Sequence, residues 1–234
     1  SLEEASFDAW IKFYRPDENA VNNQISYYDK GDIVSFVLDV EIRTASKGTK
    51  SLDDVFRHLY NEFFKKNKNY TPEDFQSSAE LMAGKPLGDF FSKYVRGREE
   101  IDFNAILGGI GLRLNEGLGK ETAYLGATLR EANGTLTVSG VPIGTPAFEQ
   151  GLNVNDQIVA VDGQRASQQF LQTYLNEKKP GDKIRLTVFR FDQLRDIEIT
   201  LEGRGRANYS IVKVDNPTEE QRRLYSEYLA AELK

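Results

Sequence analysis

The chain has 234 residues, with 30 Lys and Arg against 36 Asp and Glu and a formal net charge of −6. This acidic balance argues against a nucleic-acid partner, and no apolar run approaches the ~20 residues of a membrane span. The sequence has no cysteine and one histidine, which excludes disulfides, thiolate catalysis and a metal site built on two imidazoles. With 39% hydrophobic residues the chain can bury a core, and its length suggests one large or two modest domains.

The first half shows helical periodicity and predicts an all-α bundle of about five helices. Ser1 and Glu4 form a capping-box signature, and apolar residues follow at helical spacing as far as Pro16. Residues 15–24 are polar and predict a loop. Apolar side chains surround most of the segment 31–44, so we expect that helix to be buried on most sides.

Helix start and stop signals continue towards residue 100. Ser51 is placed to cap one helix, and Thr71 with Pro72 predicts the N-cap and first residue of another, which ends at Gly84. Residues 87–97 predict a last amphipathic helix.

The composition changes near residue 100. We expect residues 1–100 to form the helical domain, 101–119 to be a glycine-rich linker and 120–205 to form a second domain. The second domain shows the alternation of half-buried strands, interrupted by one helix. Residues 206–234 are expected to be a C-terminal extension with a helix over 217–233, which has Pro217 at or near its first position.

Residues 144–163 carry an ordered series of turn and strand signals. Pro146 starts a one-turn helix, Gly151 supplies the left-handed residue after it, and Asn155-Asp156 turns the chain into the next strand. This stretch resembles the PDZ family, in which many members have Gly-Asp in place of Asn-Asp. The resemblance implies a PDZ-like β-barrel domain after the helical bundle.

Upstream, residues 124–127 resemble the carboxylate-binding loop of bacterial, protease-associated PDZ domains. That mode implies that backbone N–H groups bind a terminal carboxylate, and that the peptide adds as a strand between residues 126–130 and a helix near 166–177. Glycine at position 126 would let the peptide backbone approach closely. In the alternative interpretation the groove is structural and is empty or covered by its own chain. The candidate peptide-binding residues are Tyr124, Leu125, Gly126, Ala127, Phe170, Leu171 and Tyr174.

The pattern Tyr28-x-Lys30-Gly31, placed just before the buried helix, resembles the gluzincin aminopeptidases. Neighbouring segments in the same order are similar to the glycyl-aminopeptidase family, namely 1–10, 14–19, 38–43 and 51–54. In that family the helical stretch follows the zinc site and precedes a PDZ domain. The resemblance therefore implies that residues 1–100 are the C-terminal part of a thermolysin-like catalytic domain.

The same resemblance implies an activity. Family members release N-terminal Gly or other small residues from peptide substrates with zinc-bound water, and Tyr28 would be the catalytic oxyanion donor. A phenol of pKa ~10 stays protonated at neutral pH and can donate to that oxyanion. The His-Glu-x-x-His motif of the family is missing from the sequence. We therefore expect no cofactor in this chain, zinc in the full-length parent, and a fragment that is inactive alone.

Other interpretations stay open for the same residues. Tyr28 would otherwise be a core or interface aromatic, and Trp10 is expected in the core. Asp39 and Arg43 lie four residues apart on the buried helix and would form an i,i+4 pair. The alternative function is a non-catalytic adaptor, in which a helical bundle presents the PDZ domain to the C-termini of partner proteins.

Overall fold

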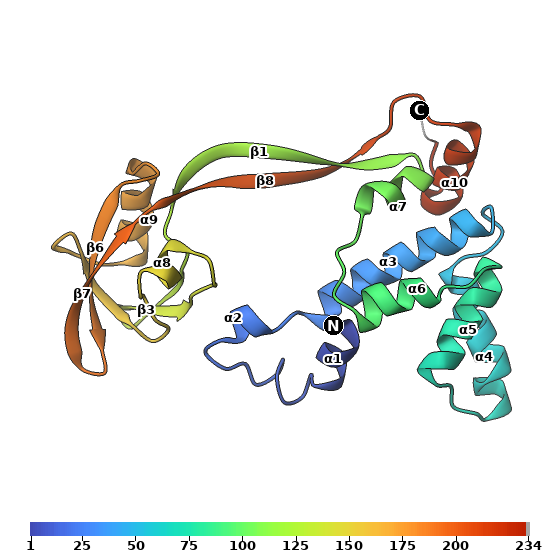
Figure 1. The fold of residues 1–234 in the computed structure, drawn as a ribbon, viewed down its shortest axis with the longest axis horizontal. Coiled ribbons are helices and arrows are strands. Elements are labelled where there is room, and N and C mark those ends of the chain that lie inside the picture. The colour runs from blue at the N-terminus through green and yellow to red at the C-terminus, as the bar shows by residue number, and fades with distance from the viewer. Residues whose placement is uncertain (233–234) are drawn as a thin grey trace. The chain divides into compact units, whose positions relative to one another are not determined.

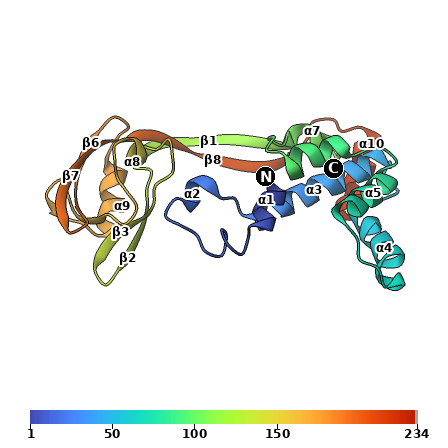
Figure 2. The ribbon, with the colours of Figure 1, turned by 60° about the horizontal axis from the view of Figure 1, so that its bottom comes forward.

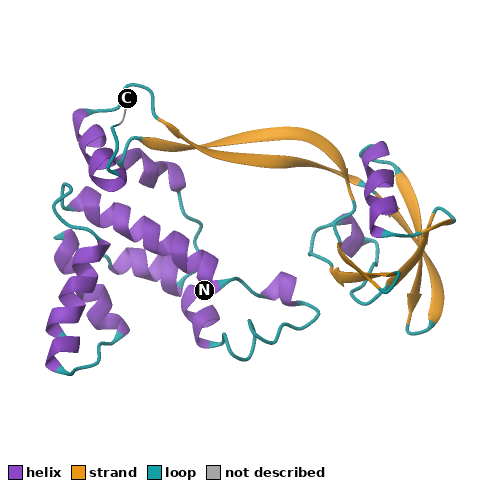
Figure 3. Ribbon diagram, turned by 180° about the vertical axis from the view of Figure 1, so that it is seen from behind, coloured by secondary structure: helices purple, strands orange, loops and turns teal. Residues whose placement is uncertain are grey.

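The computed structural model describes residues 1–232 of the chain (Figure 1). The chain divides into two compact units, each of which is built from separate segments. Helices dominate unit 1 and strands dominate unit 2 (Figure 3). Unit 1 comprises Ser1–Ala9, Ile25–Glu116 and the chain from Tyr209 onward, and unit 2 comprises Trp10–Gln24 and Gly117–Asn208.

Helix α3 (Tyr27–Ala45) is the longest helix of unit 1. Ser26 caps it, because its hydroxyl accepts a hydrogen bond from the Asp29 N–H at 3.1 Å. The expectation of a helix buried on most sides is confirmed for Val34, Val37, Leu38, Val40 and Ile42, which are buried, but not for Ile33, which is 39% exposed.

The predicted pair on α3 is also confirmed. Arg43 Nε donates to Asp39 Oδ2 at 2.8 Å, and both side chains are mostly buried. The other oxygen, Oδ1, accepts the backbone N–H of Leu52 at 2.7 Å. Asp39 therefore stabilises α3 and ties it to the start of the next helix in the chain.

Helices α4 (Leu52–Glu62) and α5 (Pro72–Ala83) begin at the predicted caps. Ser51 and Thr71 each form a capping box with the Asp three residues later. Helix α5 ends at Gly84, whose φ of +68° places it in the left-handed region that favours glycine.

The predicted last amphipathic helix has two parts. Helix α6 (Gly88–Phe90) continues directly into the π-helix η2 (Phe91–Arg96), and a short 3₁₀ turn η1 (Phe64–Lys66) follows α4. Phe90 and Phe91 are buried in the core that α3, α4 and α5 share.

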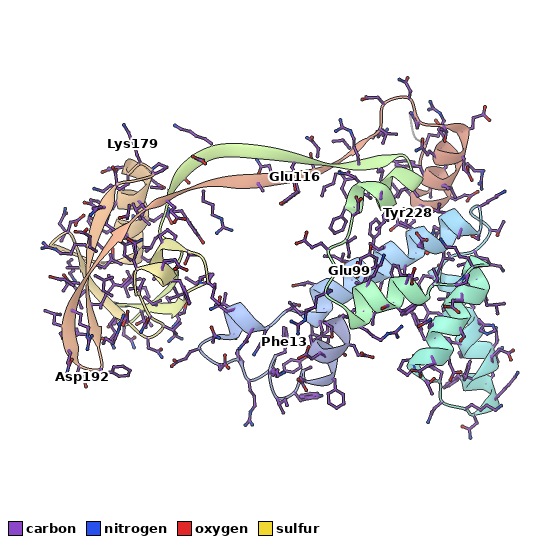
Figure 4. The ribbon with its side chains drawn as sticks, in the orientation of Figure 1. Phe13, Glu99, Glu116, Lys179, Asp192 and Tyr228 are labelled. Carbon is purple, nitrogen blue, oxygen red and sulfur yellow. The ribbon has the colours of Figure 1, made fainter. Side chains whose placement is uncertain are left out.

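Helix α1 (Leu2–Phe7) is shorter than the spacing of its aromatic residues predicts. The capping box at Ser1 is confirmed, but the chain leaves the helix after Phe7, which is 88% exposed. Trp10 is 78% exposed, so its expected place in the core is wrong. Helical spacing does not sustain a short helix when its apolar face has nothing to pack against. Phe13 lies on the irregular segment that follows (Figure 4).

The stretch 101–119, expected to be a linker, has regular structure. It holds α7 (Phe103–Gly109) and the first part of strand β1 (Leu112–Tyr124). Its glycines serve close packing in part, because a Cβ on Gly109 would lie 3.0 Å from Thr44 Oγ1 of α3. The glycine content of this stretch did not indicate that it has regular structure.

The predicted terminal helix is α10 (Glu219–Leu229), which belongs to unit 1. Leu224 is buried in a small core that α10 shares with α7, and Tyr228, labelled in Figure 4, packs on α3. Thr218 is the N-cap, so Pro217 lies before the helix and not at its first position. Residues 233 and 234, the end of the expected extension, lie outside the described residues.

Unit 2 holds an antiparallel sheet with the strand order β2-β3-β4-β6-β7, and β5 pairs with β4. Strands β2, β3, β6 and β7 are labelled in Figure 2. The two end strands of the sheet, β2 and β7, do not pair with each other. The predicted succession of a helical bundle and a strand-rich PDZ-like domain is confirmed, but the sheet of that domain is open and does not close into a barrel. The strands are β2 (Thr128–Ala132), β3 (Thr135–Gly140), β4 (Gln157–Val161), β5 (Gln164–Arg165), β6 (Lys183–Arg190) and β7 (Gln193–Thr200).

Two helices complete the core of unit 2. Helix α8 (Pro146–Glu149) is the predicted single turn, and α9 (Gln168–Glu177) is the predicted helix between strands. Ala147 of α8 and Leu171 of α9 are buried against the inward side chains of the sheet. Unit 2 thus has the predicted strands and the two predicted helices, arranged around an open sheet.

A buried ion pair lies under the turn motif of unit 2. The carboxylate of Asp156 is almost fully buried and accepts hydrogen bonds from Arg190 Nε at 2.7 Å and Nη2 at 2.6 Å. The Asn153 N–H donates to the same carboxylate at 2.8 Å. The hydrogen bond to Asp156 raises the pKa of Arg190 above its ordinary value. Asn155 has a φ of +71°, as its predicted turn position requires.

Strands β1 and β8 (Glu202–Lys213) form a separate two-stranded sheet and lie side by side in Figures 1 and 2. The boundaries between the units fall within both strands. Among residues 1–232, no helix combines the length and the apolar character that crossing a membrane requires.

Candidate functional site

Tyr28 lies in the first turn of α3, two residues after the cap at Ser26. Its side chain is 57% exposed, and its ring centroid is 4.2 Å from that of Tyr27. Tyr28 is therefore not a core residue, and its phenol lies at the surface at the positive end of a long helix. That position suits a donor to a negatively charged group.

The residues present do not fit a zinc ion. Within the described part of the chain, no three His, Cys, Asp or Glu side chains lie close enough together to hold a metal. His58, the only histidine, is half-buried on α4. A gluzincin site needs two imidazoles and a carboxylate, so the donor set of this chain is too small.

The candidate carboxylate loop is built around Gly126 and Thr145. Gly126 has a φ of +81°, and a Cβ there would lie 2.3 Å from the Cβ of Thr145. Glycine is therefore required by its backbone conformation and by the packing of Thr145. The expected reason, the approach of a peptide backbone, is not needed to explain it.

The carbonyls of this loop are held on one side. The Leu125 carbonyl accepts the Ala147 N–H at 2.9 Å, and the Gly126 carbonyl accepts the Thr145 hydroxyl at 2.9 Å. All peptide bonds in the described residues are trans, so the N–H of each peptide unit points opposite to its carbonyl.

It follows that the N–H groups of Gly126 and Ala127 both point away from α8. Neither donates a hydrogen bond within residues 1–232. Two adjacent backbone N–H groups that face the same side make a concavity suited to an anion.

Among the other predicted peptide-binding residues, two are core residues. Leu125 and Leu171 are 4% and 2% exposed and pack inside unit 2. Tyr124 is half-buried, and Arg204 lies over its ring at 4.6 Å and donates to its hydroxyl at 2.5 Å. Ala127 is half-buried beside the loop.

The aromatic residues of α9 contact the turn after β4. The Tyr174 hydroxyl donates to Asp162 Oδ2 at 2.7 Å, and its ring stacks on Phe170 at 5.4 Å. At the start of α9 the Gln168 N–H donates to Glu131 Oε2 of β2 at 2.8 Å. The structure thus brings the loop residues together, and the role of Phe170 and Tyr174 as pocket walls stays a prediction.

Sequence reasoning missed the residues that shape this loop. Thr145 precedes a proline, which is a helix N-cap signal, but that signal does not reveal its contact with Gly126, 19 residues away. Asn22 also contacts this region, through Val141 and Ile143. It lies in helix α2 (Ala20–Asn23), within the stretch 15–24 that the sequence predicted to be a polar loop.

Comparison with known proteins gives two family matches in the expected order. A family model described as M61 glycyl aminopeptidase matches residues 1–34, and a PDZ domain model matches residues 123–201. No curated protein matches the sequence. The resemblance to glycyl aminopeptidases with a PDZ domain is therefore confirmed.

A solved structure agrees with this order. An aminopeptidase N family protein from Idiomarina loihiensis is 25% identical with a TM-score of 0.81, over 96% of this chain and 40% of that one. The chain thus spans 40% of the length of that protein.

Two other similar structures match a smaller part of the chain. The HtrA-type protease AlgW with a decapeptide is 23% identical (TM-score 0.34), over 36% of this chain and 30% of that one. The PDZ domain of a carboxy-terminal protease from Vibrio cholerae, in complex with peptide, is 18% identical (TM-score 0.30), over 36% of this chain and 96% of that one.

Proposed function

We propose that this chain is the C-terminal part of a zinc-dependent aminopeptidase that releases N-terminal Gly or other small residues. One observation carries the proposal. Tyr28, an exposed phenol at the start of α3, falls within the glycyl-aminopeptidase match, and the same chain continues into a PDZ match. The likeness to an aminopeptidase N family protein over 96% of the chain supports the same assignment.

In this proposal Tyr28 supplies one hydrogen bond. Its hydroxyl donates to the oxyanion that develops on the carbonyl of the scissile peptide bond. Zinc ligands would have to come from residues outside this chain, because the described residues hold no suitable donor cluster. The chain alone is therefore expected to bind peptides without hydrolysing them.

The second part of the proposal concerns unit 2. The N–H groups of Gly126 and Ala127 would donate to a peptide C-terminal carboxylate, and the peptide would add as a strand beside β2. This arrangement is supported by the two carbonyls that are held towards α8, which leaves both N–H groups on the opposite side. Tyr124 and Leu125 complete the loop.

The aminopeptidase assignment is tested in the complete protein with a glycine anilide substrate. We expect Tyr28→Phe to lower kcat by about 100- to 1,000-fold, in line with the loss of one oxyanion donor. Tyr27→Phe is the matched control, because it removes a hydroxyl from the neighbouring ring and should keep kcat close to that of the parent.

Near-normal kcat in Tyr28→Phe would contradict the assignment. A complete protein that binds peptide C-termini but releases no N-terminal residue would favour the adaptor alternative.

A further inference from the structure

The segment Trp10–Gln24 belongs to unit 2, although it precedes α3 in the chain. Asn22 makes the central contact. Its Oδ1 accepts the Ile143 N–H at 2.7 Å, and its Nδ2 donates to the Val141 carbonyl at 3.1 Å. The side chain of Asn22 thus binds the backbone on both sides of Pro142.

Two further contacts hold this segment in place. Asn22 Nδ2 also donates to Asn19 Oδ1 at 2.8 Å, which fixes the orientation of the amide. Asn155 Nδ2 donates to Glu18 Oε1 at 2.5 Å. The surface formed by residues 141–143 and Asn155 therefore binds the polar stretch Glu18–Asn22.

This surface is connected to the carboxylate loop through one buried hydroxyl. Thr145 Oγ1 lies 2.7 Å from the Pro142 carbonyl and 2.9 Å from the Gly126 carbonyl, and the residue is 8% exposed. A hydroxyl has one proton, so the two carbonyl oxygens share Thr145 as their donor. Thr145 therefore fixes two peptide units. One joins Pro142 to Ile143, and its N–H donates to Asn22. The other joins Gly126 to Ala127, and its N–H faces the proposed carboxylate site.

We propose that Asn22 and Thr145 are positioning residues of the peptide-carboxylate site, and that docking of Glu18–Asn22 and carboxylate binding strengthen each other. The proposal rests on the proposed peptide site at Gly126 and Ala127. The physical reason is preorganisation, because a loop already held in its bound conformation loses less entropy when the ligand binds.

The test uses the 234-residue chain and a decapeptide that ends in valine with a free carboxylate. We expect Asn22→Ala to raise the Kd of this peptide by at least about fivefold, the lower end of typical coupling between sites. Thr145→Val, which removes the hydroxyl at nearly constant shape, should weaken binding as well, and Thr145→Ser should restore it.

Controls separate coupling from loss of fold and from failure of the site. The Glu18→Ala variant lacks only the outer contact to Asn155 and should change the Kd less than Asn22→Ala does. Hydrogen exchange of the Ile143 amide should slow when the peptide binds the parent chain, because linkage is reciprocal. Because any ligand stabilises the folded unit, the slowing at Ile143 should exceed that of the β4 and β6 amides. Equal slowing at all of these amides would mean a merely structural role of Asn22.

Two results would overturn the proposal, and they are distinguishable. If the parent chain binds the peptide and Asn22→Ala has the same Kd, the coupling is wrong and the peptide site stands. If the parent chain binds no peptide at millimolar concentration, the peptide site is wrong and the coupling falls with it.

Discussion

The two candidate sites differ in how much of each lies in this chain. The carboxylate loop of unit 2 is built from residues of that unit, since Thr145 and Ala147 hold the loop carbonyls by hydrogen bonds of 2.9 Å. In unit 1, Tyr28 is an exposed phenol with no metal-binding cluster in the described residues. The proposed binding site is thus complete within this chain, whereas the proposed catalytic site has only Tyr28 in it.

The two units also differ in how completely their ion pairs are buried. In unit 2 the carboxylate of Asp156 is 1% exposed and both oxygens bind Arg190. In unit 1 the side chains of Asp39 and Arg43 keep 14–17% exposure, and one oxygen of Asp39 binds the N–H of Leu52. Removing the arginine should therefore cost more in unit 2 than in unit 1.

The largest effect is expected for Arg190→Met. It leaves the Asp156 carboxylate buried without its partner, and such a loss costs about 3–5 kcal/mol of folding free energy. The measurement is hydrogen exchange of the β4 and β6 amides, which report the opening of unit 2. Lys183→Met is the matched control, because the Lys183–Glu198 pair is 64% exposed and exposed pairs contribute about 1 kcal/mol or less. Equal effects of the two variants would refute the importance of burial.

Arg43→Met makes the corresponding change in unit 1 and should cost about 1–3 kcal/mol. Asp39 keeps the N–H of Leu52 and some contact with water, so its charge is only partly uncompensated. Urea unfolding followed through the amide signals of α3 and α4 measures this value. A loss larger than that of Arg190→Met would reverse the comparison between the units.

Gly126→Ala should weaken binding of a free-carboxylate peptide by about tenfold or more. An alanine at a φ of +81° is strained by about 1–2 kcal/mol, and its Cβ would displace Thr145. Gly134→Ala is the control, because it has a similar φ of +73° and no atom within 4 Å of the added Cβ. Unchanged peptide affinity in Gly126→Ala would show that the loop does not form the site.

We expect the smallest effect in the pH dependence of the folding stability of unit 1. Hydrogen bonds from Gln76 Nε2 at 2.9 Å and from the Leu87 N–H at 3.0 Å lower the pKa of Glu80 below its ordinary value of 4.5. A carboxyl with a lowered pKa in the folded state stabilises the fold above the unfolded pKa, and this contribution disappears as the pH falls through the folded pKa. Glu80→Gln should therefore be less stable than the parent at pH 7, and the difference should shrink below pH ~4.5. Thermal unfolding of both proteins from about pH 7 to about pH 3 measures it, and a constant difference would contradict the assignment.

Local signals in the sequence predicted much of the fold. The caps at Ser51 and Thr71 and the turn at Gly151 follow from side chains close to each position in the sequence. Trp10 shows the limit of periodicity, because its spacing predicts a helical face but does not reveal whether another surface covers that face. Burial depends on tertiary packing, and the spacing of apolar residues does not indicate which other segment, if any, packs on them.

In the candidate sites, too, local sequence signals were predictable and contacts between distant residues were not. Gly126 was found from its resemblance to a known loop, but the contact with Thr145 that explains it joins residues 19 apart. The pairing of Asp156 with Arg190 spans 34 residues, and nothing near either residue in the sequence indicates it. Interactions between distant segments therefore had to come from the structure.

The most direct test of the proposed carboxylate site in unit 2 is an amide NMR titration of the 234-residue chain. The ligands are the valine-terminated decapeptide with a free carboxylate and the same peptide with a C-terminal amide. We predict that the free acid shifts the signals of Gly126 and Ala127, because their N–H groups face the carboxylate site, and that the amide peptide shifts them much less. No shift at millimolar free acid, or equal shifts with both peptides, would contradict the account.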